Sequence, residues 1–170
     1  MNRQPILQDD SVILTPLQQD EFEELLAVAS DPLIWAQHPN PDRWKREIFR
    51  TYFDGALASG GAFMIRDKAH RNAIGSTRFY DHDAEASEIK IGYTFFSRNQ
   101  WGNGTNQRVK KLMLDHAFQY VRQVIFHVGA QNMRSRIAMQ RLGAELIGEE
   151  EVAYFGEQPK RNVVFRITAP

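Results

Sequence analysis

Hydrophobic residues recur with a helical period in some segments of the chain and in short continuous or alternating runs in others. This pattern predicts a mixture of helices and strands. A strand is expected at residues 12–14. Thr15 and Pro16 then indicate a helix start, with Thr15 as the N-cap and Pro16 at the first helical position. The helical pattern continues through residues 22–29 and ends at Asp31-Pro32.

A second helix is expected after a proline-containing connector, with Asp42 as its N-cap. One side of this helix is apolar, and Ser59-Gly60-Gly61 ends it. Three strands are predicted next, at residues 62–66, 73–80 and 87–96, with polar turns between them. Short strands joined by polar turns are typical of an antiparallel meander.

A long helical pattern at residues 105–120 follows, and then a short buried strand at 124–128. Another helix at 132–142 ends at Gly143, and strands at 144–150 and 162–168 close the chain. The predicted order is β-α-α-β-β-β-α-β-α-β-β, a mixed α/β (α+β) arrangement. Since there is no linker and no internal repeat, residues 1–170 are expected to form one domain.

Composition narrows the classes of function. Lysine and arginine number 21, as do aspartate and glutamate, so no net charge draws the chain to nucleic acid or to an anionic membrane. The absence of cysteine excludes disulfides, thiolate zinc sites and a cysteine nucleophile. The histidines lack metal-ligand spacing, so no metal is expected. No apolar run reaches the length of a membrane span, and a cytoplasmic location is expected.

The first candidate for chemistry is the turn at residues 99–106, NQWGNGTN, between a predicted strand and a predicted helix. A helix start leaves backbone N–H groups without partners, and the helix dipole adds positive potential there. Because glycine has no Cβ, a ligand can approach Gly102 and Gly104 closely. These features suit a phosphate group, and the alternative is a tight β–α turn without a ligand.

A second motif at residues 132–144 contains Asn132, Ser135, Arg136 and a Leu-Gly-Ala end. With the glycine turn and the element order, it resembles the GNAT acyltransferase superfamily over nearly the whole chain. The resemblance is closest to the branch of ribosomal-protein N-terminal acetyltransferases of the RimJ/RimL type. It implies a single GNAT-like domain, with a mostly antiparallel central sheet, a splayed pair of strands and flanking helices. The usual first residue of the turn motif, glutamine or arginine, is Asn99 here.

The resemblance implies acetyl-CoA as the acyl donor. Its pyrophosphate is expected on the backbone N–H groups of Gln100, Trp101, Gly102, Asn103, Gly104 and Thr105. Its pantetheine arm is expected to pair with the backbone of Phe95, Phe96 and Ser97. Asn132 is expected to bond the arm, or else to act only as an N-cap. By family position, Arg136 is the arginine expected to meet a phosphate of CoA.

The acid that protonates the leaving thiolate departs from the family pattern. Many members use a tyrosine seven residues after the asparagine, and this chain has Met139, which cannot donate a proton. Ser135 is the best substitute, acting directly or through water. The alternative is a serine hydroxyl bonded to the preceding helical turn.

The attacking amine must lose a proton, and Glu88 is the candidate base. It lies two residues before Lys90, which occupies a position where the related branch often has glutamate. The alternative is an exposed strand carboxylate paired with Lys90 or Arg78. Lys110 and Lys111 on the long helix are expected to be solvated.

The sequence therefore predicts direct N-acetylation of a primary amine, either a protein N-terminus or a small molecule. Lys90, Met139 and Asn162 differ from the family pattern and keep open a degenerate acyl-CoA-binding sensor. A nucleotide-binding domain is a further alternative, although the turn lacks a Walker lysine and dinucleotide spacing. A homodimer is compatible with the resemblance. Four aromatic residues either line an acceptor cleft or pack in the core: Trp35, Trp44, Tyr80 and Tyr154.

Overall fold

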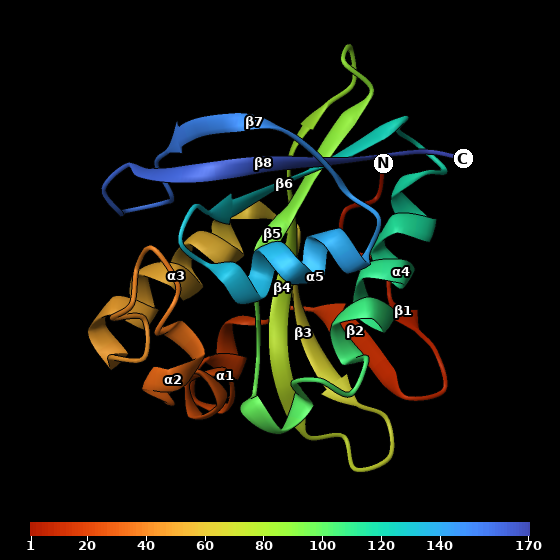
Figure 1. The fold of residues 1–170 in the computed structure, drawn as a ribbon. Coiled ribbons are helices and arrows are strands. Elements are labelled where there is room, and N and C mark those ends of the chain that lie inside the picture. Colours follow the sequence, from red (N-terminus) through yellow and green to blue (C-terminus); the bar gives the residue numbers. More distant parts are fainter.

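The strands form one sheet in the order β1-β2-β3-β4-β5-β6-β8-β7 in the computed structural model, which describes residues 1–170 (Figure 1). The strands are β1 (Leu7–Gln8), β2 (Val12–Pro16), β3 (Ala62–Asp67), β4 (Ala73–Asp83), β5 (Glu88–Phe96), β6 (Gln123–Gly129), β7 (Glu145–Val152) and β8 (Lys160–Thr168). The α-helices are α1 (Phe22–Ala29), α2 (Pro32–Trp35), α3 (Arg46–Ser59), α4 (Thr105–Ala117) and α5 (Met133–Arg141). Short 3-10 helices, Gln19–Glu21 and Arg98–Gln100, precede α1 and α4. None of the helices combines the length and the hydrophobicity that crossing a bilayer requires.

Every neighbouring pair of strands is antiparallel except β5 and β6. These two run parallel because α4 carries the chain across the sheet between them. Their ladder holds only three pairs, from Glu88↔Gln123 to Lys90↔Ile125. Beyond Lys90 the strands diverge, so the predicted splayed pair is present. The predicted meander of β3, β4 and β5 is also confirmed.

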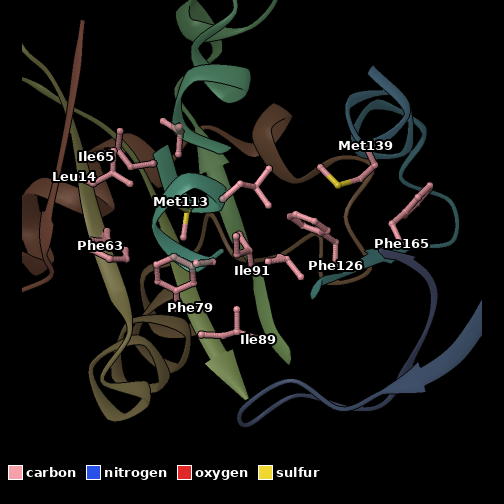
Figure 2. Packing of buried hydrophobic residues seen from close by; sticks show 14 of the residues in the cluster. Leu14, Phe63, Ile65, Phe79, Ile89, Ile91, Met113, Phe126, Met139 and Phe165 are labelled. Atoms are coloured by element: carbon pink, nitrogen blue, oxygen red, sulfur yellow. The ribbon is translucent and has the colours of Figure 1, made fainter. Parts of the chain in front are cut away.

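Two apolar clusters cover the two faces of the sheet. Helices α4 and α5 pack on one face through a cluster that includes Val109, Met113 and Met139. Figure 2 shows Met113 between labelled residues of β2–β4 and those of β6, α5 and β8. Helices α1, α2 and α3 pack on the other face around Phe22 and Trp35. Burial on both faces therefore holds the splayed strands in a rigid frame.

A β-bulge interrupts β5 just beyond the splay. Ser76 pairs with Phe95 and Arg78 pairs with Gly92, so Thr77 faces both Tyr93 and Thr94. Tyr93 takes a positive φ of 54° there. A non-glycine residue in this region is strained and persists only where its surroundings fix it. The hydroxyl of Tyr52 does so by donating to the Tyr93 carbonyl oxygen at 2.6 Å.

Two predicted helix starts are wrong. Thr15 and Pro16 end β2, where Pro16 pairs with Phe63, and helix α1 begins only at Phe22. Proline fits this strand end because the pairing with β1 stops at Leu14, so no neighbour on that side needs its missing N–H. Asp42 does not cap the helix that begins at Arg46. It forms an ion pair with Lys45 instead.

Candidate active site

A cavity of about 640 Å³ lies where β5 and β6 diverge. Its walls come from both strands beyond their last pair, from α5, from α2 and its following loop, from α4 and the turn before it, and from the β7–β8 loop. No aspartate or glutamate lines it. Besides two histidines, the ionisable basic side chains that line it are Arg43, Lys110, Arg134 and Arg141. The cavity therefore attracts anions and offers no partner to an ammonium group.

The glycine turn lines this cavity through Gln100, Trp101, Gly102 and Gly104. Gly102 and Gly104 have φ values of 74° and 86°, in the region that favours glycine. A Cβ on either residue would meet no atom within 4 Å. Backbone conformation therefore requires these glycines, and the space beside them is open to a ligand.

Several backbone N–H groups of this turn have no acceptor in the protein: those of Gly102, Asn103, Gly104, Asn106 and Gln107. The N–H groups of Gln100 and Trp101 donate to carbonyl oxygens of the preceding 3-10 turn. That of Thr105 donates to the Asn103 side chain at 3.2 Å. The free donors thus lie about two residues closer to α4 than the sequence predicted, at the positive end of the helix dipole.

The predicted pantetheine strand is partly open. Phe95 and Phe96 line the cavity, and each pairs with β4 on one edge only, since β6 has already diverged. Ser97 does not line the cavity, and its N–H donates to the Ile74 carbonyl oxygen at 2.9 Å. The free edge that a ligand could join is therefore Phe95-Phe96.

Asn132 combines the two roles that the sequence left open. Its Oδ1 accepts from the Ser135 N–H at 3.3 Å, so it is the N-cap of α5. It also lines the cavity, and its Nδ2 donates to no protein group. Ser135 and Met139 line the cavity from the same helix. The Ser135 hydroxyl has no hydrogen-bond partner in the protein, so it is free to meet a ligand.

The arginine predicted from the family position is not at the cavity. Arg136 donates through Nη1 to the Ala130 carbonyl oxygen at 2.9 Å and does not line the space. Arg134 and Arg141 do line it. The Arg134 guanidinium lies 3.8 Å from the ring centroid of Trp101, a residue of the glycine turn, and its Nη2 donates to the Ile34 carbonyl oxygen at 2.9 Å. Trp101 itself packs as expected, with Nε1 donating to the Phe96 carbonyl oxygen at 3.3 Å.

Glu88 is also remote from the cavity. It lies at the start of β5, before the splay, where its carboxylate accepts from Gln123 Nε2 at 3.1 Å. It lines a separate shallow depression with residues of the β4–β5 hairpin. The structure therefore does not bring Glu88 together with Ser135. Lys90, its predicted partner, pairs with Asp81 instead at 3.0 Å.

A cluster of aromatic side chains surrounds Arg43 on the side of the cavity that faces α2. Arg43 is 1 % exposed, and its guanidinium forms two hydrogen bonds with the Glu157 carboxylate at 2.7 and 2.8 Å. Four rings lie within 6 Å of its Cζ: Trp35, Tyr52, Tyr93 and Tyr154. The pair ties the β7–β8 loop to the helical side of the sheet. Trp35 and Tyr154 line the cavity, whereas Trp44 and Tyr80 do not.

Asn162, which differs from the family pattern, has a structural role beside the cavity. Asn162 is fully buried, and its Oδ1 accepts from the Tyr154 hydroxyl at 2.8 Å. Arg161 beside it turns outward to Glu149. Asn162 therefore positions an aromatic residue of the cavity wall rather than supplying a charge.

Lys110 is one of the polar groups of the cavity that sequence reasoning missed. Lys110 on α4 was expected to be solvated, yet it is 3 % exposed and lines the cavity. Its Nζ donates to Thr94 Oγ1 at 2.6 Å and reaches Thr77 Oγ1 at 3.4 Å. Burial lowers the pKa of Lys110 to about 7. The neighbouring apolar positions Val109 and Met113, on the buried face of α4, were the signal that this lysine lies inside.

Comparison with known proteins gives a family for this arrangement. Residues 11–145 match the family model described as the acetyltransferase (GNAT) domain. Among curated protein sequences, none matches the chain significantly. Within the described chain, no group of three or more histidine, aspartate or glutamate side chains is placed to hold a metal.

Solved structures share the fold at low sequence identity. A GCN5-related N-acetyltransferase from Brucella melitensis has a TM-score of 0.79 and 21 % identity, over 97 % of this chain and 79 % of that one. A Vibrio cholerae protein assigned as a ribosomal-protein-serine acetyltransferase has a TM-score of 0.76 and 16 % identity, over 99 % of this chain and 100 % of that one. The microcin C7 self-immunity acetyltransferase MccE, solved with acetyl-CoA and AMP, has a TM-score of 0.75 and 13 % identity, over 95 % of this chain and 94 % of that one.

Proposed function

The chain belongs to the GNAT acetyltransferase family, and from this premise we propose that it transfers acetyl from acetyl-CoA directly to a primary amine. The observation that carries the proposal is the row of free N–H donors between Gly102 and Gln107. They open onto a cavity whose charged side chains are all cationic. This arrangement fits the pyrophosphate of CoA, and the guanidinium groups of Arg134 and Arg141 in the same cavity could add charge-assisted bonds to its phosphates.

The splay fits the rest of the donor. A pantetheine arm that joined the free edge of Phe95 and Phe96 would bring its thioester between β5 and β6, beside Asn132 and Ser135. There the amine nitrogen attacks the thioester carbonyl carbon, the C–N bond forms, and the C–S bond breaks. Transfer is direct because the chain has no cysteine to carry the acetyl group. Ser135 would orient the sulfur through its free hydroxyl.

The lining of the cavity also bears on the acceptor. An ammonium ion finds no carboxylate there, so an acceptor that is partly neutral at pH 7 is favoured. An α-amino group, with a pKa of about 8, meets this condition better than a lysine side chain, at about 10.4. We therefore propose a protein N-terminus or a small α-amino compound as the acceptor. The Vibrio cholerae relative is compatible with the first, in the RimJ/RimL manner.

The test measures CoA binding by calorimetry and thiol release with a panel of amines. Gly104→Glu is expected to abolish acetyl-CoA binding, because it places a carboxylate at the free amides. Gly143→Glu is the matched control. Gly143 also has a positive φ, at 80°, and open space for a Cβ, but it does not line the cavity. The two variants share the same backbone strain and the same added charge.

Loss of binding in Gly104→Glu, with binding retained in Gly143→Glu, supports the assigned site. Equal binding by both folded variants would contradict it. If the protein binds CoA tightly but releases no thiol with any amine, the acyl-CoA sensor replaces the enzyme.

A further inference from the structure

Lys110 is the one lysine of the cavity wall, and the family pattern gives it no role. Its side chain is almost fully buried, and no carboxylate lies within ion-pair distance of Nζ. Two threonine hydroxyls are its only partners, one of them at 3.4 Å. An ammonium group has three N–H bonds, so at least one is unmatched by the protein. Since burying such a group is costly, its retention here points to a function.

Nζ lies beside the segment that the thioester would reach. Thr94, its nearer partner, belongs to β5 between the splay at Lys90 and the free edge at Phe95. Thr77, its other partner, faces Thr94 across the β-bulge, and their hydroxyl oxygens are 2.8 Å apart. Both strands and α4 thus fix Nζ at the bulge. Lys110 itself is about one and a half turns into α4, a rigid element.

Other ionisable groups of the cavity are poor proton donors to a leaving sulfur. Arginine does not release its proton in proteins. Burial raises the pKa of both Tyr93 and Tyr154, which favours their neutral, protonated form. The Tyr154 hydroxyl already donates to Asn162. The hydroxyl of Ser135 also keeps its proton at neutral pH and can only relay one.

The two histidines are engaged by protein groups. His38 Nδ1 accepts from the Asn40 N–H at 3.0 Å, and its Nε2 lies 3.2 Å from the Arg43 guanidinium. Burial and that guanidinium hold the pKa of His38 well below its usual range. His127 has Nε2 against the Glu150 carboxylate and Nδ1 3.4 Å from the Tyr80 hydroxyl. Both nitrogens of His38 are therefore engaged, and each nitrogen of His127 lies against a protein group.

We propose that the ammonium group of Lys110 protonates the CoA sulfur as the acetyl group leaves. The proposal rests on the acetyltransferase function put forward above. As the C–S bond breaks, the sulfur takes the electron pair and accepts a proton from Nζ, which yields CoA thiol and a neutral lysine. The new amide nitrogen releases one proton to solvent, and Lys110 regains one from solvent. The net reaction is acetyl-CoA plus amine to amide plus CoA.

The surroundings of Lys110 match this task. The groups that face it are the hydroxyls of Thr77 on β4 and Thr94 on β5, and the sulfur of Met113 lies next to Thr77. Desolvation lowers its pKa to about 7, and no charged group forms a hydrogen bond or an ion pair with Nζ. An alkyl thiol has a pKa of about 8.5. Proton transfer from Lys110 to the thiolate is therefore downhill, as it would not be from an exposed lysine.

The experiment compares Lys110→Met, Lys110→Arg and the control Lys111→Met by kcat, KM for acetyl-CoA and the pH profile of kcat. Lys111 is the adjacent exposed lysine, paired with Asp115. Lys110→Met is expected to lower kcat by about 100-fold, the usual contribution of a general acid, with KM changed less than about threefold. The wild-type fall in kcat above about pH 7 should vanish. Lys110→Arg should stay slow, because arginine keeps its proton.

The outcomes separate this proposal from the proposed function. If wild-type protein turns over and Lys110→Met matches it, Lys110 is not the donor. Recovery of wild-type kcat in Lys110→Arg would show that charge alone matters, which also overturns the proposal. Disappearance of the same pH limb in Ser135→Ala with Lys110 intact would show that the sulfur receives its proton through the Ser135 hydroxyl, which overturns direct transfer from Nζ. A wild-type protein that binds CoA without releasing thiol overturns the proposed function itself, and this step with it.

Discussion

Replacing Lys110 with methionine is expected to stabilise the protein near neutral pH. The lysine is buried without a counter-ion, so its charged form loses hydration that the two threonine hydroxyls only partly replace. Methionine has a similar length and no charge, and it tolerates irregular spaces in a core. The variant that slows catalysis should therefore make the fold more stable.

The magnitude follows from the pKa of Lys110, which is about 7 in the folded protein and 10.5 for an exposed lysine. At pH 7 the unfolded chain holds a full proton on this group, whereas the folded protein holds about half of one. At about 1.4 kcal/mol for each pKa unit, this costs the folded state roughly 4 kcal/mol. The variant also loses the hydrogen bond to Thr94, which lowers its stability by about 1 kcal/mol. The net gain in Lys110→Met is about 3 kcal/mol at pH 7.

The sign of the pH dependence is fixed by the lowered pKa. Between about pH 7 and 10.5 the unfolded chain binds more protons than the folded protein, so wild-type stability rises with pH. The methionine variant lacks this rise, and its advantage should shrink to about zero near pH 10. Guanidinium unfolding of both proteins at pH 7 and pH 10, with Lys111→Met as the control, measures the difference. A stability difference that is equal at the two pH values would refute the reasoning.

Further substitutions test two residues of the cavity wall, Arg43 through its partner Glu157 and Asn132 directly. Glu157→Gln should lower the free energy of unfolding by about 3–5 kcal/mol, because it leaves the buried Arg43 charge without its partner. The control is Glu149→Gln at the exposed pair with Arg161, which should not change the free energy of unfolding measurably. If Glu157→Gln lowers the free energy of unfolding no more than Glu149→Gln does, the ion pair of Arg43 and Glu157 is hydrated. Asn132→Ala should cost about 1 kcal/mol through the lost N-cap and also weaken acetyl-CoA binding. Asn132→Asp keeps the N-cap but loses the free amide donor, so calorimetry should show wild-type stability with weaker acetyl-CoA binding. Unchanged binding in this variant would show that Asn132 acts only as the N-cap.

A costly buried lysine fits the usual trade-off between stability and function. Removing a charge that the core has not paired commonly stabilises a fold, and sites that need such a group retain it for their chemistry. The effect of Lys110→Met on kcat and its effect on the free energy of unfolding are independent tests. A gain in stability without a loss of kcat would leave Lys110 as a structural residue only.

Local features of the chain were readable in the sequence. The meander, the helix after Gly104 and the N-cap at Asn132 depend on short-range periodicity, on capping and on backbone angles that glycine adopts. Pro16 shows the limit of such signals. Proline is compatible with a helix start and with a strand end, and only the missing neighbour beyond Leu14 decides between them.

The functional side chains divide in the same way. The glycine turn was located from sequence, because its donors lie on consecutive residues of one loop. Arg136 and Glu88 were selected by their place in a motif, but whether a side chain reaches a cavity depends on its direction and on where two strands separate. Arg134 and Lys110 reach it for that reason. Lys110 has a weak sequence signal in its apolar neighbours Val109 and Met113, whereas Arg134 has none.

The sequence by itself determined the order of elements, the phosphate-type turn and the GNAT resemblance, since each depends on residues that are near one another along the chain. Only the tertiary structure decided which amides of the turn are free, which arginines line the cavity and how deeply Lys110 is buried. These properties arise where β4, β5, β6, α4 and α5 meet. Burial and electrostatics there are set by residues far apart in sequence, and a linear pattern does not contain that proximity.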